Sequence, residues 1–247
     1  MIKKAATFLF SIYGFTVFVV LMLLLFPFIV LVSLLPFPVD GNWVYKIARL
    51  WATLFFFFTG IRYRAINKEF YRKDQTFILI SNHISYMDIP MMMLATRWRT
   101  LRVLGKAEMT RIPIFGFIYK SGAITIQRNN AEDRKASVEK MKTIAKNHIS
   151  IAIYPEGTFN QTDQPLKSFY DGAFRLAIDL QLPLLPILFP DTRERLNQKS
   201  IFSMTPGICR AVFLPAISTT GLTANDLYSL KEKAHHLMTE ELIKIGY

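Results

Sequence analysis

The feature that most limits how this chain can fold is a long run, from Ala5 to Leu35, that contains no charged side chain. About 20 apolar residues are enough to cross the hydrocarbon core of a bilayer, and the part from Ala5 to Phe26 already has that length. Two lysines precede the run, as in a signal peptide, but the run is too long for one and no small-residue cleavage site follows it cleanly. Pro27 and Pro36 predict a kink and then the end of a helix. The sequence therefore predicts a membrane-associated helix over this stretch.

A second apolar segment runs from Trp43 to Tyr63, but Lys46 and Arg49 interrupt its first half. Its uncharged core, Leu50 to Thr59, is too short to span a bilayer. Aromatic and basic side chains favour the headgroup region, so an interfacial or re-entrant helix is expected. The alternative is a core helix of the domain that follows. The first helix and this second segment are expected to form an anchoring hairpin over residues 1–64, followed by an α/β domain over residues 65–247.

Beyond residue 64 the sequence alternates short apolar runs with amphipathic helices, which predicts an α/β fold. The sheet should be mostly parallel and flanked by helices on both faces, because buried parallel strands read as continuous apolar runs. The expected strands are Phe77–Ile80, Leu101–Leu104, Ala123–Ile126, Ile149–Tyr154, Leu184–Phe189 and Cys209–Leu214. The expected helices are Ile89–Arg97, Asn130–Asn147, Gly172–Gln181 and Thr223–Ile245.

The first of these strands ends in polar residues, Ser81, Asn82 and His83. Ligands of open α/β sheets bind at the carboxyl ends of the strands, so this edge is the expected site. The next helix cannot begin much before Asp88, because Pro90 is tolerated only in a first turn. A loop therefore connects the strand to the helix.

His83 and Asp88 are five residues apart across this loop, which allows the carboxylate to turn back to the imidazole. A carboxylate there would fix the tautomer and leave the second ring nitrogen free as a general base. The alternative is structural. Asp88 would cap the helix, since Ser85 and Asp88 have the spacing of a capping box, and His83 would be an ordinary hydrogen-bonded loop residue.

Two further strand ends carry candidate residues. Arg128 follows the strand 123–126, and a guanidinium there can present a planar fork to a phosphate. Glu156, Gly157 and Thr158 follow a proline after the strand 149–153. Glycine would let the backbone approach a ligand, and the glutamate, at the rim, would bind hydroxyls or balance basic groups. The alternative for Arg128 is an exposed arginine in a charged loop. The alternative for the second group is an ordinary Pro-Glu-Gly turn.

The formal net charge of +12 favours nucleic acid, anionic lipid or an acidic partner. No zinc-finger, helix-turn-helix or RNA-recognition signature accompanies it, so anionic lipid is expected and nucleic acid is not. The single cysteine, Cys209, lies in an apolar run and is expected in the core. Neither a G-x-S-x-G nucleophile nor an H-E-x-x-H metal site is present, and no metal is expected.

Four blocks in order resemble those of the 1-acylglycerol-3-phosphate acyltransferase family: the N-H-x-S-x-x-D block at 82–88, G-x-I-x-I-x-R at 122–128, Y-P-E-G-T at 154–158 and an apolar strand with prolines at 182–187. The resemblance covers roughly residues 64–214. It implies that Lys106, at a recurrent family position, is a second phosphate contact. This chain departs from the family at Phe159-Asn160, where the family often has serine or arginine, and at Phe169-Tyr170-Asp171, where it often has a lysine just before the glycine at Gly172. One basic contact is then missing, or Lys167 supplies it.

The resemblance implies an enzyme that moves a fatty acyl group from a thioester, acyl-CoA or acyl-carrier protein, to the sn-2 hydroxyl of lysophosphatidic acid. His83 and Asp88 would be catalytic, and Arg128, Glu156, Gly157, Thr158 and Lys106 would bind substrate. No cofactor is implied beyond this co-substrate. The alternatives are another acceptor, such as glycerol 3-phosphate or a lyso-aminolipid, or a non-catalytic lipid-binding protein. The expected location is the inner, cytoplasmic membrane, with the catalytic domain facing the cytoplasm.

Overall fold

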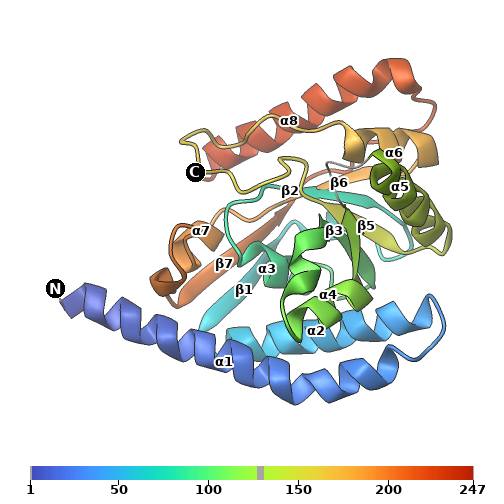
Figure 1. Cartoon of the computed structure of the whole chain (residues 1–247). Helices are drawn as coiled ribbons and strands as arrows, with labels where there is room; N and C mark the ends of the chain where they lie inside the picture. Colours follow the sequence, from blue (N-terminus) through green and yellow to red (C-terminus); the bar gives the residue numbers. More distant parts are fainter. Residues whose placement is uncertain (1, 127–130, 247) are drawn as a thin grey trace.

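A seven-stranded sheet forms the centre of the computed structural model, which describes residues 2–126 and 131–246 (Figure 1). The strands lie in the order β1-β7-β6-β2-β5-β3-β4. Neighbours are parallel except for β6 and β7, so β1 and β7 run opposite to the other five. The predicted, mostly parallel α/β sheet is confirmed. The strands are β1 (Ile61–Ile66), β2 (Ile78–Ser81), β3 (Leu101–Lys106), β4 (Ala123–Ile126), β5 (Ser150–Ile153), β6 (Leu184–Leu188) and β7 (Gly207–Phe213).

Helices cover both faces of the sheet, as the sequence predicts (Figure 1). On one face lie α5 (Ala131–Lys146), α6 (Gly172–Leu180) and α8 (Leu227–Lys244). On the other lie α1 (Ile2–Val32), α2 (Val39–Phe58), α3 (Asp88–Ala95) and α4 (Phe115–Gly122), of which only α4 is not expected from the sequence. The short α7 (Thr192–Arg195) follows β6. Single 3-10 turns are η1 (Lys68–Phe70), η2 (Ala107–Arg111), η3 (Ile201–Ser203) and η4 (Ala224–Asp226).

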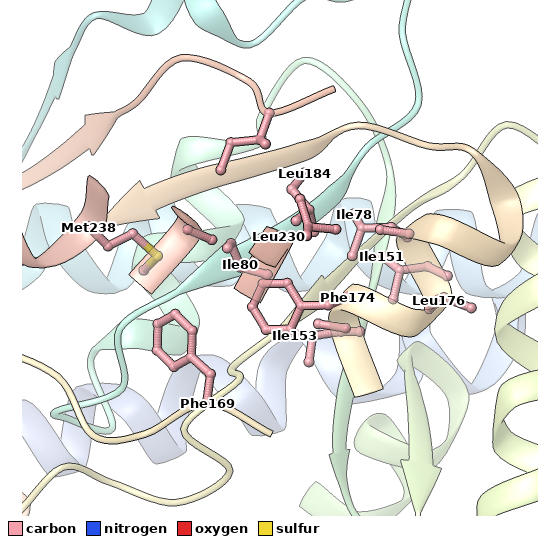
Figure 2. Packing of buried hydrophobic residues seen from close by; sticks show 14 of the residues in the cluster. Ile78, Ile80, Ile151, Ile153, Phe169, Phe174, Leu176, Leu184, Leu230 and Met238 are labelled. Atoms are coloured by element: carbon pink, nitrogen blue, oxygen red, sulfur yellow. The ribbon is translucent and has the colours of Figure 1, made fainter. Parts of the chain in front are cut away.

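The central strands β2, β5 and β6 are buried along their whole length, which explains their unbroken apolar sequences. Successive side chains of a strand point to opposite faces, so β2 contributes to two cores. Ile78 and Ile80 join the core under α6 and α8, where Figure 2 shows them beside Phe174. Leu79 joins the core on the other face. Cys209 is fully buried there, as expected.

The second apolar segment is a helix only as far as Phe58, and the prediction that it continues to Tyr63 is wrong. The helix ends because Gly60 takes a positive φ of 64°, a conformation that glycine adopts readily. The chain then enters β1, which pairs with β7 over its full length. β1 extends to Ile66, so the strand crosses the boundary expected after residue 64.

Helix α2 packs into the α/β domain, which supports the alternative that it is a core helix. Its Tyr45, Phe55 and Phe56 are almost fully buried, in the same hydrophobic cluster as Met87 of the β2–α3 loop and Met91 of α3. Several apolar side chains of α2 remain exposed, Leu50 and Phe57 among them, beside the polar Lys46 and Thr53. An interfacial position for these exposed side chains stays a prediction.

Helix α1 has the length and composition of a membrane span from Lys4 to Val32, and an 18-residue stretch within it has a mean hydropathy of 3.1 and is little buried. The helix also contacts a segment of the domain that is far from it in the sequence, around residues 202–204. The backbone N–H of Met204 donates to the hydroxyl of Ser11 over 2.9 Å, and the ring of Phe8 lies 5.0 Å from that of Phe202. The hairpin and the domain therefore form one packed unit.

Candidate active site

The loop between β2 and α3 lies at the carboxyl edge of the sheet, where β2 and the parallel strands β5 and β3 all end (Figure 1). α3 begins at Asp88, which leaves Pro90 in the first turn, as the sequence predicts. Asn82 joins the loop to the residue that follows the neighbouring strand β6. Its side-chain amide donates to the carbonyl of Phe189 over 3.2 Å and accepts from the N–H of the same residue over 2.8 Å.

His83 and Asp88 form the predicted pair. Nδ1 of His83 lies 2.9 Å from Oδ2 of Asp88. The carboxylate is fully buried, whereas the imidazole is 17% exposed. Within the part of the chain that the structure describes, Nε2 of the imidazole has no hydrogen-bond partner. A carboxylate on Nδ1 favours the tautomer with its proton there and leaves Nε2 as a base toward solvent.

The same carboxylate also organises the loop. Its Oδ2 accepts hydrogen bonds from the backbone N–H of Ile84 over 2.8 Å and of Ser85 over 2.9 Å. The reciprocal half of a capping box is missing, because the hydroxyl of Ser85 accepts from the N–H of Met87 and donates to the carbonyl of Leu196. The structural alternative and the predicted pairing are thus compatible, because one carboxylate shapes the turn and also contacts the imidazole; the catalytic role of Asp88 stays a prediction.

Aromatic rings enclose the imidazole of His83. The ring of Tyr154 stacks on it with centroids 4.2 Å apart, and that of Phe159 lies 4.3 Å away. The hydroxyl of Tyr154 donates to the backbone carbonyl of Asp88 over 3.0 Å. Burial, and next the charge of Asp88, raise the pKa of this phenol well above its usual value, so it remains a neutral donor. The imidazole is therefore held on its faces by rings and on one edge by the carboxylate.

Glu156 is not at the rim, as expected, but is only 1% exposed. Its Oε1 accepts from the N–H of His83 over 2.7 Å, and its Oε2 from the N–H of Lys167 over 2.9 Å. Burial raises the pKa of this carboxyl to about 7, against the opposing effect of these two hydrogen bonds. Glu156 thus joins the catalytic loop to the segment around Lys167. Gly157 takes a positive φ of 73° beside it, which explains the glycine in the turn.

A hollow of about 390 Å³ opens beside Phe159, whose ring packs against the imidazole. It is lined by Lys106, Thr158, Phe159, Gln161, Thr162 and Lys167. Two lysines from separate segments therefore line one space, and Nζ of Lys167 donates to the hydroxyl of Thr158 over 2.7 Å. Lys106 is paired in the sheet with Ile126, the last residue of β4. The predicted phosphate contact Arg128, two residues further, lies outside the described residues.

A family model for the acyltransferases matches residues 62–189, which include the whole loop from β2 to α3 and the 154–158 turn. The chain belongs to the acyltransferase family. Two curated relatives have more specific names. The 1-acyl-sn-glycerol-3-phosphate acyltransferase alpha of Mus musculus is 29% identical over 195 residues, 78% of this chain and 68% of the relative. The beta form from Homo sapiens is 27% identical over 193 residues, 78% and 69% of the two chains.

A solved structure has the same fold as this acyltransferase: the 1-acyl-sn-glycerophosphate acyltransferase PlsC of Thermotoga maritima. It superposes with a TM-score of 0.81 over 98% of this chain and 97% of the other, at 19% identity. The similarity extends over the amino-terminal helices as well as the sheet, because nearly all of both chains is covered. The family prediction made from the four sequence blocks is thereby confirmed, and the protein is an enzyme of the O-acyltransferase type.

Sequence reasoning missed one side chain of this acyltransferase site. The hydroxyl of Thr192, at the start of α7, donates to Oδ1 of Asp88 over 2.6 Å. The two residues are 104 positions apart, so no spacing rule could join them. Asn82, in contrast, lies within the recognised block next to His83 and could have been singled out for its position.

Proposed function

We propose that this acyltransferase moves a fatty acyl group from a thioester to the sn-2 hydroxyl of lysophosphatidic acid, giving phosphatidic acid for phospholipid synthesis. The observation that carries this proposal is the His83–Asp88 pair next to a hollow with two lysines. A base beside a cationic space fits an acceptor that has a hydroxyl near a phosphate. The names of the relatives from mouse and human support the same acceptor.

The chemistry needs a base that is held in one orientation. Nε2 of His83 takes the proton of the acceptor hydroxyl while the oxygen of that hydroxyl bonds to the carbonyl carbon of the thioester. Asp88 stabilises the imidazolium that results, because its carboxylate is 2.9 Å from Nδ1. The tetrahedral intermediate then collapses with cleavage of the carbon–sulfur bond. The proton on Nε2 passes to the departing sulfur, and the ester and the free thiol leave.

The hollow is suited to the phosphate of the acceptor. A phosphomonoester carries close to two negative charges, and Lys106 and Lys167 supply two positive charges from separate segments. Lys167 would replace the basic residue that the family often has where this chain has Phe159. Arg128 is proposed as a third contact, since β4 ends just before it and opposite Lys106. Gly157 and Thr158 would border the same group.

The acyl donor is proposed to be acyl-CoA or acyl-carrier protein, since the chemistry requires only a thioester. α1 is the proposed membrane anchor, in the inner membrane with the catalytic edge facing the cytoplasm, where both donors occur. The lipid acceptor would then reach His83 from the bilayer next to the exposed apolar faces of α1 and α2.

The test compares two acceptors, lysophosphatidic acid and monoacylglycerol, which lacks the phosphate. Purified protein in detergent is assayed for release of thiol from acyl-CoA with wild type, Lys106→Ala, Lys167→Ala and Arg128→Ala. Loss of one partner of a desolvated ion pair costs about 2–5 kcal/mol. We expect each variant to lose about 30-fold or more of kcat/KM on lysophosphatidic acid, and little on monoacylglycerol, which wild type uses poorly.

A lysine in place of Arg128 should recover part of the activity, because an ammonium has the charge but not the planar fork. An equal loss on both acceptors would show that these residues support the site without reading a phosphate. Thiol release with glycerol 3-phosphate or a lyso-aminolipid in preference to lysophosphatidic acid would replace the proposed acceptor. No thiol release with any acceptor would favour a lipid-binding protein.

A further inference from the structure

We propose that Thr192 is a positioning residue for catalysis: its hydroxyl fixes the plane of the Asp88 carboxylate and thereby the orientation of the His83 base. The proposal rests on the proposed function, in which His83 removes the acceptor proton. Thr192 lies outside the blocks that carry the family resemblance, on the short helix α7. It belongs to a different strand connection from the pair it contacts.

The contact is short and dry. Oγ1 of Thr192 lies 2.6 Å from Oδ1 of Asp88, and both residues are fully buried. The hydroxyl has one proton, and a carboxylate accepts it more strongly than the carbonyl of Phe189, which is 3.3 Å away. Among the described residues no other group donates to Oδ1. A water molecule cannot readily replace the threonine at a position without solvent, so its loss leaves a buried oxygen unpaired.

The two oxygens of Asp88 have different tasks. Oδ2 receives three hydrogen bonds from one side, from Nδ1 of His83 and from the N–H groups of Ile84 and Ser85. Rotation of the carboxylate about its Cβ–Cγ bond would move both oxygens, so the three bonds at Oδ2 oppose it at one oxygen only. The Thr192 hydroxyl opposes the same rotation at the second oxygen, and together they hold the plane of the carboxylate. The direction of the lone pair that receives the Nδ1 proton then follows from both.

Hydrogen bonds of two neighbouring residues, Asp191 and Phe189, hold Thr192 in place. Asp191, just before it, binds Arg210 of β7 through the backbone N–H over 2.7 Å, Nε over 2.8 Å and Nη2 over 2.6 Å. Phe189, at the end of β6, is bonded twice to the amide of Asn82. The β6–α7 connection is therefore fixed to the strand on one side and to the catalytic loop on the other. Because the connection is fixed in this way, α7 cannot shift to bring another donor to Asp88 when the Thr192 hydroxyl is removed.

The test uses Thr192→Val, which keeps the shape and removes the hydroxyl, and Thr192→Ser, which keeps the hydroxyl and removes the methyl. Thr219→Val is the matched control. Thr219 is also buried, at 1% exposed, and its hydroxyl donates to the carbonyl of Leu182 over 2.9 Å, away from the site. Full-length proteins are compared in detergent for kcat, KM for lysophosphatidic acid and the midpoint of thermal unfolding.

We expect Thr192→Val to lower kcat by about 10- to 100-fold, the equivalent of one hydrogen bond to a charged group, with KM unchanged. Thr192 does not line the hollow, so substrate binding should not respond. Thr192→Ser should stay within about threefold of wild type. Thr219→Val should lower the unfolding midpoint about as much as Thr192→Val but leave kcat unchanged. Thr192→Ala serves in place of valine if valine does not fold at this position.

Combination with Asp88→Asn separates this inference from the proposed function. Thr192→Val should add no further loss in that background, because the two residues act as a unit. An unchanged kcat in Thr192→Val, or an equal loss in Thr192→Ser, would overturn the positioning role. If Asp88→Asn and His83→Ala themselves remained active, the proposed mechanism would fail, and not only the role of Thr192.

Discussion

Replacement of Glu156 by glutamine should make the enzyme less active and, at alkaline pH, more stable. The buried carboxyl of wild type has a pKa raised to about 7 from its ordinary value of 4.5. Between these two values the native protein holds a proton that the unfolded chain has released. The free energy of unfolding of wild type therefore falls as the pH rises from 4.5 to 7. Glutamine does not titrate, so Glu156→Gln lacks this contribution.

The magnitude follows from the same values. A factor of ten in an acid constant is worth about 1.4 kcal/mol, so the rise in pKa corresponds to about 3 kcal/mol across this window. Glutamine resembles the protonated carboxyl, and the variant should match wild type near pH 5. Near pH 8 it should be more stable by about 3 kcal/mol, or about 6–12 °C in the unfolding midpoint for a chain of this size.

Activity should change in the opposite direction. The ionised carboxylate accepts from the N–H of both His83 and Lys167, whereas glutamine has one acceptor oxygen for these two donors. One of the two segments is then released, and kcat at pH 8 should fall by about tenfold or more, as for one lost hydrogen bond to a charged group. The N–H that loses its partner is that of His83, the proposed base, or that of Lys167, which lines the hollow.

The assay is thermal unfolding in detergent at pH 5, 6, 7 and 8, with thiol release measured in parallel. Glu69→Gln is the control, because Glu69 is an exposed carboxylate and its loss should shift the midpoint little and equally at every pH. A constant difference between wild type and Glu156→Gln over this range would refute a raised pKa. A variant that became relatively less stable toward pH 8 would show that the two N–H donors dominate over burial.

Three further predictions concern the His83–Asp88 pair and the amino-terminal hairpin. His83→Ala should abolish turnover with little effect on lipid binding, and Asp88→Asn should lose nearly as much. The double variant should be no worse than His83→Ala, and turnover like that of wild type in His83→Ala would remove it as the base. Removal of residues 1–35 should release the protein from the membrane pellet in a high-salt wash, which persistent sedimentation would contradict. Removal of residues 1–64 should leave no cooperative unfolding transition, because α2 leaves the core and β1 is cut.

Local sequence patterns predicted the central strands and the catalytic loop because their causes are local. The run before Ser81 is apolar on both faces, and Pro90 limits where the next helix can begin. β1 was missed because its alternating sequence directly follows an apolar helix, and only Gly60 marks the change. That strand exposes its arginines and pairs with a partner near the other end of the chain.

The site divides in the same way. The His83–Asp88 pair could be predicted because the two residues are only five positions apart, on either side of one short loop. The burial of Glu156 could not, because it depends on two backbone donors from separate segments, and its sequence context is that of an exposed turn. Thr192 reaches the site only through the packing of the sheet, and it has no local pattern that distinguishes it from other polar loop residues. Lys167 could be named as a candidate only because the family resemblance pointed to a missing basic contact.

The pairing of β1 with β7 has a consequence for synthesis of the protein. β1 leaves the ribosome directly after the apolar hairpin, but its partner begins at Gly207. At about 5–20 residues per second, the edge of β1 remains unpaired for on the order of ten seconds. An open strand edge can pair with other chains during that time. If α1 is the membrane anchor proposed above, its early insertion into a bilayer would hold each nascent chain apart from the next and would protect this edge until β7 is made.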